Sequence, residues 1–244
     1  MTNKIKLKNS SWTFGRKVPK SFEKHITKSV PFYDEGHKVI TNLSDFFLKD
    51  GSILYDLGCS TGNLIKKISL RHSNKKINFI GIDSIKEMIN QANLNKKKNK
   101  LNLKCKISFK KADIQKFKLK KNDMLISYYT IQFLPSKIRQ KVIDKIYKSL
   151  NWGGAFIMCE KIRGPDARFQ DILTLMYNEF KLENNFTSEE ILQKSRSLKG
   201  VLEPFSDKGN LDMLKRSGFK ESKMEVAFIN SKGFGGNNAT AVVI

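Results

Sequence analysis

The fold is decided by the stretch Tyr55-Asp-Leu-Gly-Cys-Ser-Thr-Gly-Asn63 (YDLGCSTGN), which follows a short apolar run. An apolar run that stops at a glycine-rich turn predicts a buried strand followed by a ligand-binding loop. A dinucleotide-binding loop needs glycines in the spacing GxGxxG. Gly58 and Gly62 are instead four positions apart, with Ser60 midway between them. The turn is therefore open enough for a ligand, but it is not tuned for a pyrophosphate.

Around this turn, short runs rich in β-branched residues alternate with longer segments that carry apolar residues at helical spacing. This alternation implies right-handed βαβ crossovers and a parallel sheet with helices on both faces, an α/β Rossmann-like fold. The predicted strands are Ile53–Leu57, Ile77–Ile82, Cys105–Phe109, Met124–Tyr128 and Ala155–Cys159, and the predicted helices between them are Asn63–Arg71, Ile85–Asn95 and Ser136–Leu150.

Trp152-Gly-Gly is interpreted as the end of a helix, after which the chain returns to a strand. After Cys159 the alternation of strands and helices changes. Residues 161–206 are predicted to be a helical insertion over the carboxyl ends of the strands, where open α/β sheets bind ligands. The insertion contains two predicted helices, Asp166–Lys181 and Ser188–Ser197, and a third predicted helix, Asn210–Arg216, follows it. Two final strands, Lys223–Ile229 and Ala239–Ile244, are predicted to complete a mostly parallel seven-stranded sheet.

The composition fits one domain spanning residues 1–244, with 39% hydrophobic residues. No window approaches the roughly 18 consecutive apolar residues of a membrane helix, so we expect a cytoplasmic protein. The three cysteines are far apart, which suggests neither a disulfide framework nor a zinc site, and no metal is expected. The net charge of +23 is spread along the chain, so a basic surface is favoured over a nucleic-acid site, although contact with RNA stays open.

The pattern D-x-G-x-S-x-G, from Asp56 to Gly62, resembles motif I of the class I S-adenosylmethionine (SAM)-dependent transferases. The resemblance implies that the glycine-rich backbone lies beside the methionine portion of SAM. It also implies that Asp56 helps to order the loop.

Two further acids end the next predicted strands. Asp83 follows the glycine turn by about 20 residues, where a carboxylate can accept hydrogen bonds from both ribose hydroxyls. Asp113 suits the adenine amino group, and Ile114 can pack on the adenine ring. Each acid alone could be only a helix cap. Together, at successive strand ends, they predict an adenosine-type site.

Several other runs resemble the carboxy-S-adenosylmethionine synthase family, over roughly residues 12–220. They are Trp12-Thr-Phe, ITKSVPFY (Ile26–Tyr33), YDLGCS (Tyr55–Ser60), TIQFL (Thr130–Leu134), DKIY (Asp144–Tyr147), Trp152-Gly-Gly and Cys159-Glu-Lys161. Membership would imply a class I transferase fold and a homodimer. It would also imply conversion of SAM and prephenate into carboxy-SAM and phenylpyruvate, in the service of tRNA wobble-uridine modification.

The resemblance also assigns site residues. The implied cofactor contacts are Tyr33, Gly58, Cys59, Ser60, Asp83, Ser84, Asp113 and Ile114, besides Asp56 and Gly62 of motif I. Three positions depart from the family pattern: Ser84 and Tyr128 stand where the family has Asn, and the family's QKRS run appears as Gln193-Lys-Ser-Arg-Ser197. Arg196, which would hold the transferred carboxylate, and Tyr128, beside the sulfonium, are the candidate catalytic residues.

Other residues have weaker claims. His25, His37 and His72 are expected at the surface, and Glu160 is the one acidic candidate for proton handling, with a structural role favoured. Arg163 and Arg168 are as well explained by surface ion pairs as by substrate binding. Residues 1–40, with Trp12 and Phe14, are a candidate lid over the cofactor.

Two other functions stay open. One is a SAM-dependent methyltransferase acting on a small molecule, with Tyr128 and the altered arginine run selecting a different acceptor. The other is a non-catalytic RNA-binding module that uses the basic surface.

Overall fold

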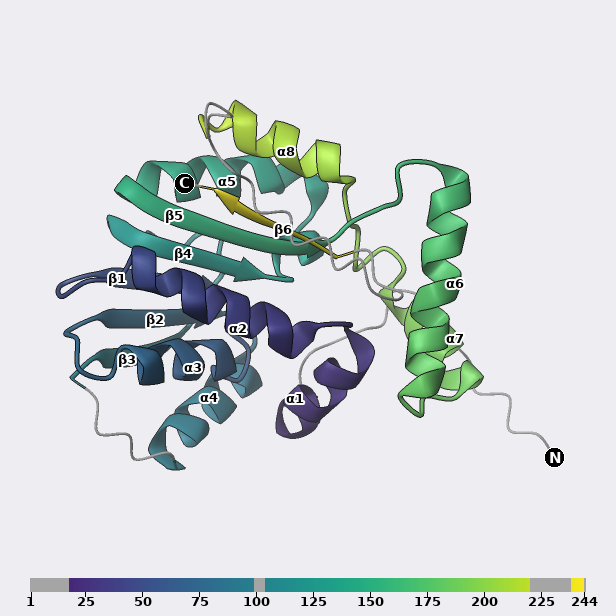
Figure 1. Ribbon diagram of the computed structural model, residues 1–244, viewed down its shortest axis with the longest axis horizontal. Helices are drawn as coiled ribbons and strands as arrows, with labels where there is room; N and C mark the ends of the chain where they lie inside the picture. Colours follow the sequence, from purple (N-terminus) through teal and green to yellow (C-terminus); the bar gives the residue numbers. More distant parts are fainter. Residues whose placement is uncertain (1–17, 99–103, 220–237, 244) are drawn as a thin grey trace.

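The computed structural model describes residues 18–98, 104–219 and 238–243. Among these residues, six strands form one sheet in the order β3-β2-β1-β4-β5-β6, and only β6 runs antiparallel to its neighbour (Figure 1). The strands are β1 (Ile53–Leu57), β2 (Asn78–Asp83), β3 (Lys106–Lys111), β4 (Asn122–Tyr128), β5 (Leu150–Lys161) and β6 (Asn238–Val243).

The predicted Rossmann-like α/β fold is confirmed, with differences in its strands. The sheet has six described strands, whereas seven were expected; the predicted strand Lys223–Ile229 lies outside the described residues. Strand β5 is longer than expected, because it begins at Leu150 and continues through the Trp152-Gly153 pair that was interpreted as a stop. Gly153 has φ 74° and Trp152 is fully exposed. An irregular, solvent-facing start of a strand thus carries the same sequence signals as a loop.

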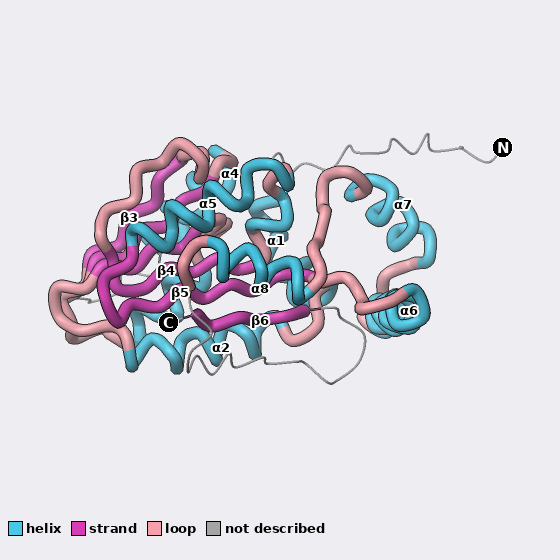
Figure 2. The backbone as a smooth tube through the Cα atoms, turned by 90° about the horizontal axis from the view of Figure 1, so that it is seen from above, coloured by secondary structure: helices cyan, strands magenta, loops and turns pink. Residues whose placement is uncertain are grey.

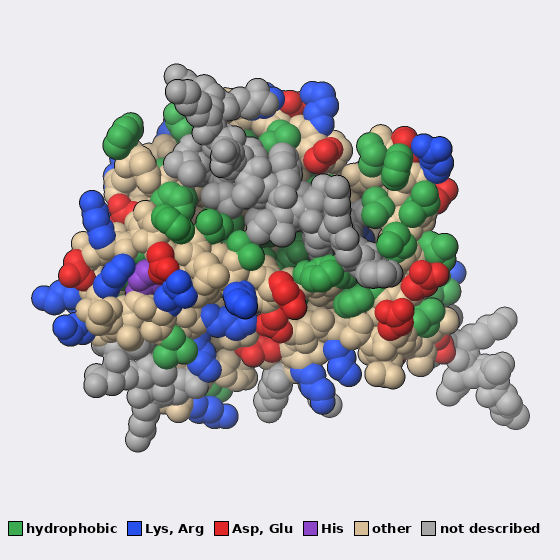
Figure 3. Space-filling view, in the orientation of Figure 1, with side chains coloured by type: hydrophobic (Ala, Val, Ile, Leu, Met, Phe, Trp, Pro, Cys, Tyr) green, Lys and Arg blue, Asp and Glu red, His purple; other side chains and the backbone are tan. Residues whose placement is uncertain are grey.

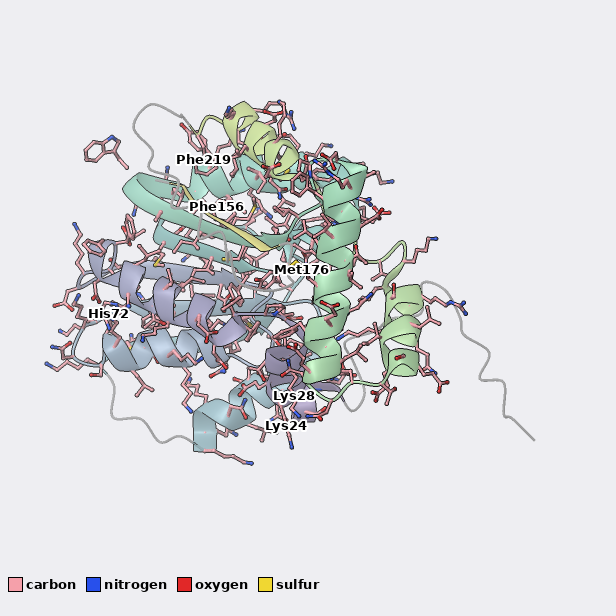
Figure 4. All side chains as sticks on the ribbon, turned by 45° about the vertical axis from the view of Figure 1, so that its right-hand side comes forward. Lys24, Lys28, His72, Phe156, Met176 and Phe219 are labelled. Atoms are coloured by element: carbon pink, nitrogen blue, oxygen red, sulfur yellow. The ribbon has the colours of Figure 1, made fainter. Side chains whose placement is uncertain are left out.

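Helices cover both faces of the sheet (Figure 2). Apolar residues of α2 (Tyr33–Leu43), α3 (Asn63–Arg71) and α4 (Lys86–Lys98) pack in one core cluster with the sheet. Those of α5 (Ser136–Ser149) and α8 (Asp207–Arg216) pack in the other. In this second cluster the rings of Phe156 and Phe219 lie 6.0 Å apart between centroids (both labelled in Figure 4).

Three helices stand at the carboxyl ends of the strands: α1 (Val18–Ser29), α6 (Ala167–Glu183) and α7 (Ser188–Leu198) (Figures 1 and 4). Helix α6 begins after Asp166, whose side chain accepts a hydrogen bond from the Phe169 amide, and α7 begins with a capping box at Thr187. Helix α1 contacts α6, and the Tyr177 hydroxyl donates to the Ser29 carbonyl oxygen at 2.8 Å. Segments about 150 positions apart in the chain are therefore joined directly beside the strand ends.

The prediction that all three histidines lie at the surface was wrong. His72 is 2% exposed and its Nε2 lies 2.8 Å from the Ser44 hydroxyl, at the end of the molecule remote from α6 (Figure 4). His37 is 1% exposed, and burial lowers its pKa to about 3, so the ring is neutral. Both residues lie in polar stretches of the sequence, but the packing of α2 and α3 on the sheet buries them.

Helix α2 is fitted to the sheet through Gly36. The Tyr128 hydroxyl, at the end of β4, donates to the Tyr33 carbonyl oxygen at 2.7 Å, across the turn of α2 that contains Gly36. A Cβ atom at position 36 would lie 2.3 Å from that hydroxyl oxygen. The absence of a side chain at Gly36 therefore leaves the space that the Tyr128 hydroxyl occupies.

We predict that Gly36→Ala lowers the free energy of unfolding by about 1–3 kcal/mol, because Tyr128 must move and lose its hydrogen bond. Tyr128→Phe removes the closest atom, so Gly36→Ala should cost less in that background. Urea unfolding of the two single variants and the double variant measures this coupling. Equal costs in both backgrounds, or the gain of up to about 1 kcal/mol expected from helix propensity alone, would contradict it.

Candidate active site

One cavity of about 300 Å³ opens at the carboxyl ends of β1, β2 and β4. Open α/β sheets bind their ligands at this edge, and the volume lies at the lower end of the usual range for small-molecule sites. Seven of the residues predicted from the sequence line it: Tyr33, Gly58, Ser60, Asp83, Ser84, Ile114 and Tyr128.

The glycine turn has the backbone geometry that its sequence suggests. Gly58 and Gly62 have φ 77° and 79°, and Ser60 between them has φ 51°. Glycine adopts such angles at no steric cost. A Cβ at Gly58 would also lie 2.1 Å from the Thr130 hydroxyl oxygen, and one at Gly62 would lie 2.5 Å from the Phe109 ring. Both glycines are required by close packing as well as by φ.

Asp83 ties this turn to the next helix. Its Oδ2 accepts a hydrogen bond from the Ser60 amide at 3.0 Å, and its Oδ1 accepts one from the Ile85 amide at 2.9 Å. Burial raises the pKa of this carboxyl group, and the backbone hydrogen bonds oppose that shift. The carboxylate lines the cavity at 9% exposure, so it both orders the turn and faces the cavity.

Three other predicted residues of the turn region lie outside the cavity lining. Asp56 is 2% exposed, and burial, followed by the charge of Asp83, raises its pKa to about 7. The Cys59 side chain is buried against Gly81, and burial raises the pKa of its thiol, which leaves it protonated. Gly62 belongs to a larger surface depression of about 720 Å³ between α3, α4 and β3, which lacks the acids at the strand ends.

Asp113 and Arg196 also lie outside the lining. Asp113 is exposed, and its Oδ1 accepts a hydrogen bond from the Gln115 amide, whereas the neighbouring Ile114 faces the cavity. Arg196 is an exposed residue of α7, and Arg163 and Arg168 are exposed as well. The roles assigned to Asp113 and Arg196 stay predictions.

Tyrosines form the wall next to the glycine turn. Tyr33, the first residue of α2, packs against Tyr128 with ring centroids 5.1 Å apart and against Tyr129 at 6.4 Å. Burial raises the pKa of all three hydroxyls, so the rings stay neutral. Tyr129 has φ 55°, an angle that a bulky residue rarely adopts, and its amide donates to the Cys159 carbonyl oxygen at 2.7 Å. Strained residues of this kind often lie at functional sites.

The far side of the cavity is basic, and sequence reasoning missed it. Lys161 at the end of β5, Tyr177 of α6 and Lys194 of α7 line the cavity, together with His25 of α1. The Lys194 ammonium group lies 2.8 Å from His25 Nε2. Lys161 and Lys194 belong to the CEK and QKSRS runs, but with so many lysines nothing in the pattern singles them out.

Glu160 has a structural role. Its two carboxylate oxygens accept hydrogen bonds from the Ile131 and Gln132 amides, both at 2.9 Å, which fixes the short 3₁₀ helix Ile131–Phe133. Burial raises the pKa of its carboxyl group to about 8. It is absent from the cavity lining, in agreement with the structural interpretation favoured from the sequence.

Comparison with known proteins identifies the family. A family model described as a methyltransferase domain matches residues 48–228. The carboxy-S-adenosyl-L-methionine synthase of Staphylococcus epidermidis is 39% identical over 211 residues, which cover 86% of this chain and 90% of that protein. The chain belongs to the carboxy-SAM synthase family. The synthase of Campylobacter lari is 33% identical over 222 residues, 91% of this chain and 92% of its own.

Solved structures support the fold. A cyclopropane synthase of Mycobacterium tuberculosis has a TM-score of 0.56 at 13% identity, covering 87% of this chain and 66% of its own. A SAM-dependent methyltransferase of Methanosarcina mazei has a TM-score of 0.57 at 15% identity, covering 83% and 95%. The predicted family is thus confirmed, and with it an enzyme of the SAM-dependent transferase class.

We predict that Asp83→Ala raises the Kd for SAM at least about tenfold, or about 1.4 kcal/mol, because it removes the acceptor that orders the glycine turn. Isothermal titration calorimetry measures the Kd. Asp207→Ala, at an exposed position on α8, is the matched control and should bind SAM as the wild type does. Unchanged SAM affinity in Asp83→Ala would remove the carboxylate from the binding site.

Proposed function

We propose that this protein is a cytoplasmic carboxy-SAM synthase that converts SAM and prephenate into carboxy-SAM and phenylpyruvate, the former serving tRNA wobble-uridine modification. The proposal is carried by the identity of 39% to a synthase over most of both chains. It is supported by a single cavity that joins the SAM-type elements at the strand ends to a basic wall. No helix in the described ranges has the length and apolarity to cross a membrane.

In this proposal SAM occupies the side of the cavity formed by the glycine turn. Asp83 accepts hydrogen bonds from the ribose hydroxyls, and Ile114 packs on the adenine ring, with Ser84 at the rim. Gly58 and Ser60 lie beside the methionine portion. Asp56, Cys59 and Gly62 do not contact SAM but shape the glycine turn. Asp113, at its exposed position, accepts a hydrogen bond from the adenine amino group.

The sulfonium of SAM then faces the wall of Tyr33 and Tyr128. Neutral aromatic rings attract a cation through their π faces without offering it a nucleophile. A proton leaves the methyl group, and the resulting ylide captures the carboxyl group that prephenate releases. The prephenate ring becomes aromatic as phenylpyruvate, and its hydroxide departs with the proton as water. Arg196 would contribute to binding the transferred carboxylate.

Two segments complete the proposed site within one domain, residues 1–244. The lid predicted over residues 1–40 is supported by its described part, because Phe22, Ile26 and Pro31 line the cavity. Trp12 and Phe14 lie outside the described residues. Residues 161–206 form the insertion that faces the co-substrate. Enclosure between them would exclude water from a reactive ylide.

The curated relatives do not favour the alternative of an ordinary small-molecule methyltransferase. A non-catalytic RNA-binding module would use the basic surface and would not need the cavity at the strand ends. Because the chain belongs to a family of enzymes, we expect small molecules to be the ligands of this cavity.

Mass spectrometry tests the reaction directly. Purified protein incubated with SAM and prephenate should yield phenylpyruvate and a nucleoside heavier than SAM by one carboxyl group, in equal amounts. Omission of prephenate is the control. Binding of SAM without consumption of prephenate would contradict the proposal, and production of S-adenosylhomocysteine with an added acceptor would point to methyl transfer.

We further propose that the protein is a homodimer that pairs through α6. The large apolar residues exposed on this helix and on α7 include Phe169 (43% exposed), Ile172 (46%), Leu175 (61%), Leu182 (47%) and Leu192 (51%). Apolar side chains gather over α6 in the space-filling view (Figure 3). Contiguous apolar surface of this kind marks interaction sites, and a second copy would cover it symmetrically.

We predict that Leu175→Glu converts the dimer to a monomer, because it buries a charge in the apolar interface. Light scattering coupled to size-exclusion chromatography gives the mass. Leu94→Glu, at a 51% exposed position on α4, is the matched control and should leave the dimer intact. A monomeric wild type, or a dimeric Leu175→Glu variant, would show that α6 is not the interface.

A further inference from the structure

Three lysines from different elements cluster around Tyr177 and Ser29 beside the cavity. Lys161 Nζ lies 4.7 Å from the centroid of the Tyr177 ring, and Lys181 Nζ lies 3.7 Å from it. Lys194 Nζ lies 3.4 Å from the hydroxyl of Ser29, the residue whose carbonyl oxygen accepts the hydrogen bond from Tyr177. The cluster therefore joins β5, α6 and α7 at the end of α1.

Lys161 and Lys194 are partly buried, and Lys181 is buried. Lys181 is 7% exposed. Burial and then the charges of Lys161 and Lys194 lower its pKa to about 7, and burial lowers the pKa of Lys194 to about 8. Among the described residues, the ion pairs include no carboxylate on Lys161 or Lys181. Tyr177 offers its ring but no charge, because burial raises the pKa of its hydroxyl to about 12.

Buried cations that repel each other lower stability, and a fold retains such an arrangement at functional sites. An anion bound among them would offset the repulsion and restore their charge. Lys161, Lys194 and Tyr177 line the same cavity as Gly58 and Asp83, so the anion would lie opposite the glycine turn.

We propose that Lys161 and Lys194 bind a carboxylate of the anionic co-substrate, and that Lys181 positions Tyr177 and adds positive potential behind them. This inference rests on the proposed function, under which the co-substrate is a dicarboxylate. It assigns carboxylate recognition within one protomer to two lysines supported by a third, in addition to the arginine predicted from the sequence.

The test compares Lys161→Gln, Lys194→Gln and Lys181→Met with Lys137→Gln, an exposed lysine on α5 that serves as the matched control. The KM for prephenate should rise at least about tenfold in the first two variants, while the Kd for SAM changes less than about twofold. For Lys181→Met we expect a higher KM for prephenate and a melting temperature at pH 7 equal to or above that of the wild type, because a buried cation is removed. Lys181→Arg should restore part of the prephenate affinity.

Malonate, a simple dicarboxylate, separates this inference from the proposed function. It should raise the melting temperature of the wild type and of Lys137→Gln, but not that of the Lys161→Gln, Lys194→Gln double variant. If the wild type ignores prephenate but malonate stabilises it through these lysines, the proposed function fails and the anion subsite stands. If the wild type turns over prephenate and the lysine variants keep its KM, or if malonate stabilises the double variant equally, the subsite is overturned.

Discussion

The structure depends on the carboxylate of Asp83. It accepts hydrogen bonds from the Ser60 and Ile85 amides, so one side chain fixes the turn after β1 to the start of the segment after β2. Amide donors offset the cost of holding this charge at low exposure. Without the Asp83 carboxylate, the Ser60 amide would lose the acceptor that stabilises Ser60 in its left-handed conformation. Under the proposed function, structural order and ribose recognition use the same two oxygen atoms.

The two sides of the cavity differ in electrostatic character. The glycine-turn side carries Asp83 and neutral tyrosine rings, which suit a sulfonium cation. The opposite side carries Lys161 and Lys194, which suit an anion. An enzyme that joins a cation to the carboxyl group of an anion needs both in one water-poor space. Burial of like charges lowers stability, and bound substrate would offset that loss.

Tyr128 illustrates how a departure from a family pattern can be absorbed locally. Its hydroxyl bonds to the backbone of Tyr33, and Gly36 leaves the space that it fills. The tyrosine therefore forms part of the wall and also anchors α2. This double role shows how the tyrosine at this position is accommodated against α2.

The sequence by itself determined the α/β alternation, the glycine turn, the acid at position 83 and the family, because these depend on local periodicity and on motifs contiguous in the chain. The five parallel strands and the last strand were predicted, although β5 begins at Leu150 and not at Ala155. Only the tertiary structure decided that Asp113 and Arg196 are exposed, that His37 and His72 are buried, and that Lys161 and Lys194 face the cavity. Burial and convergence depend on which helices pack together across long stretches of chain. In a chain with 46 basic residues, no local pattern separates a lysine that lines the cavity from one that faces solvent.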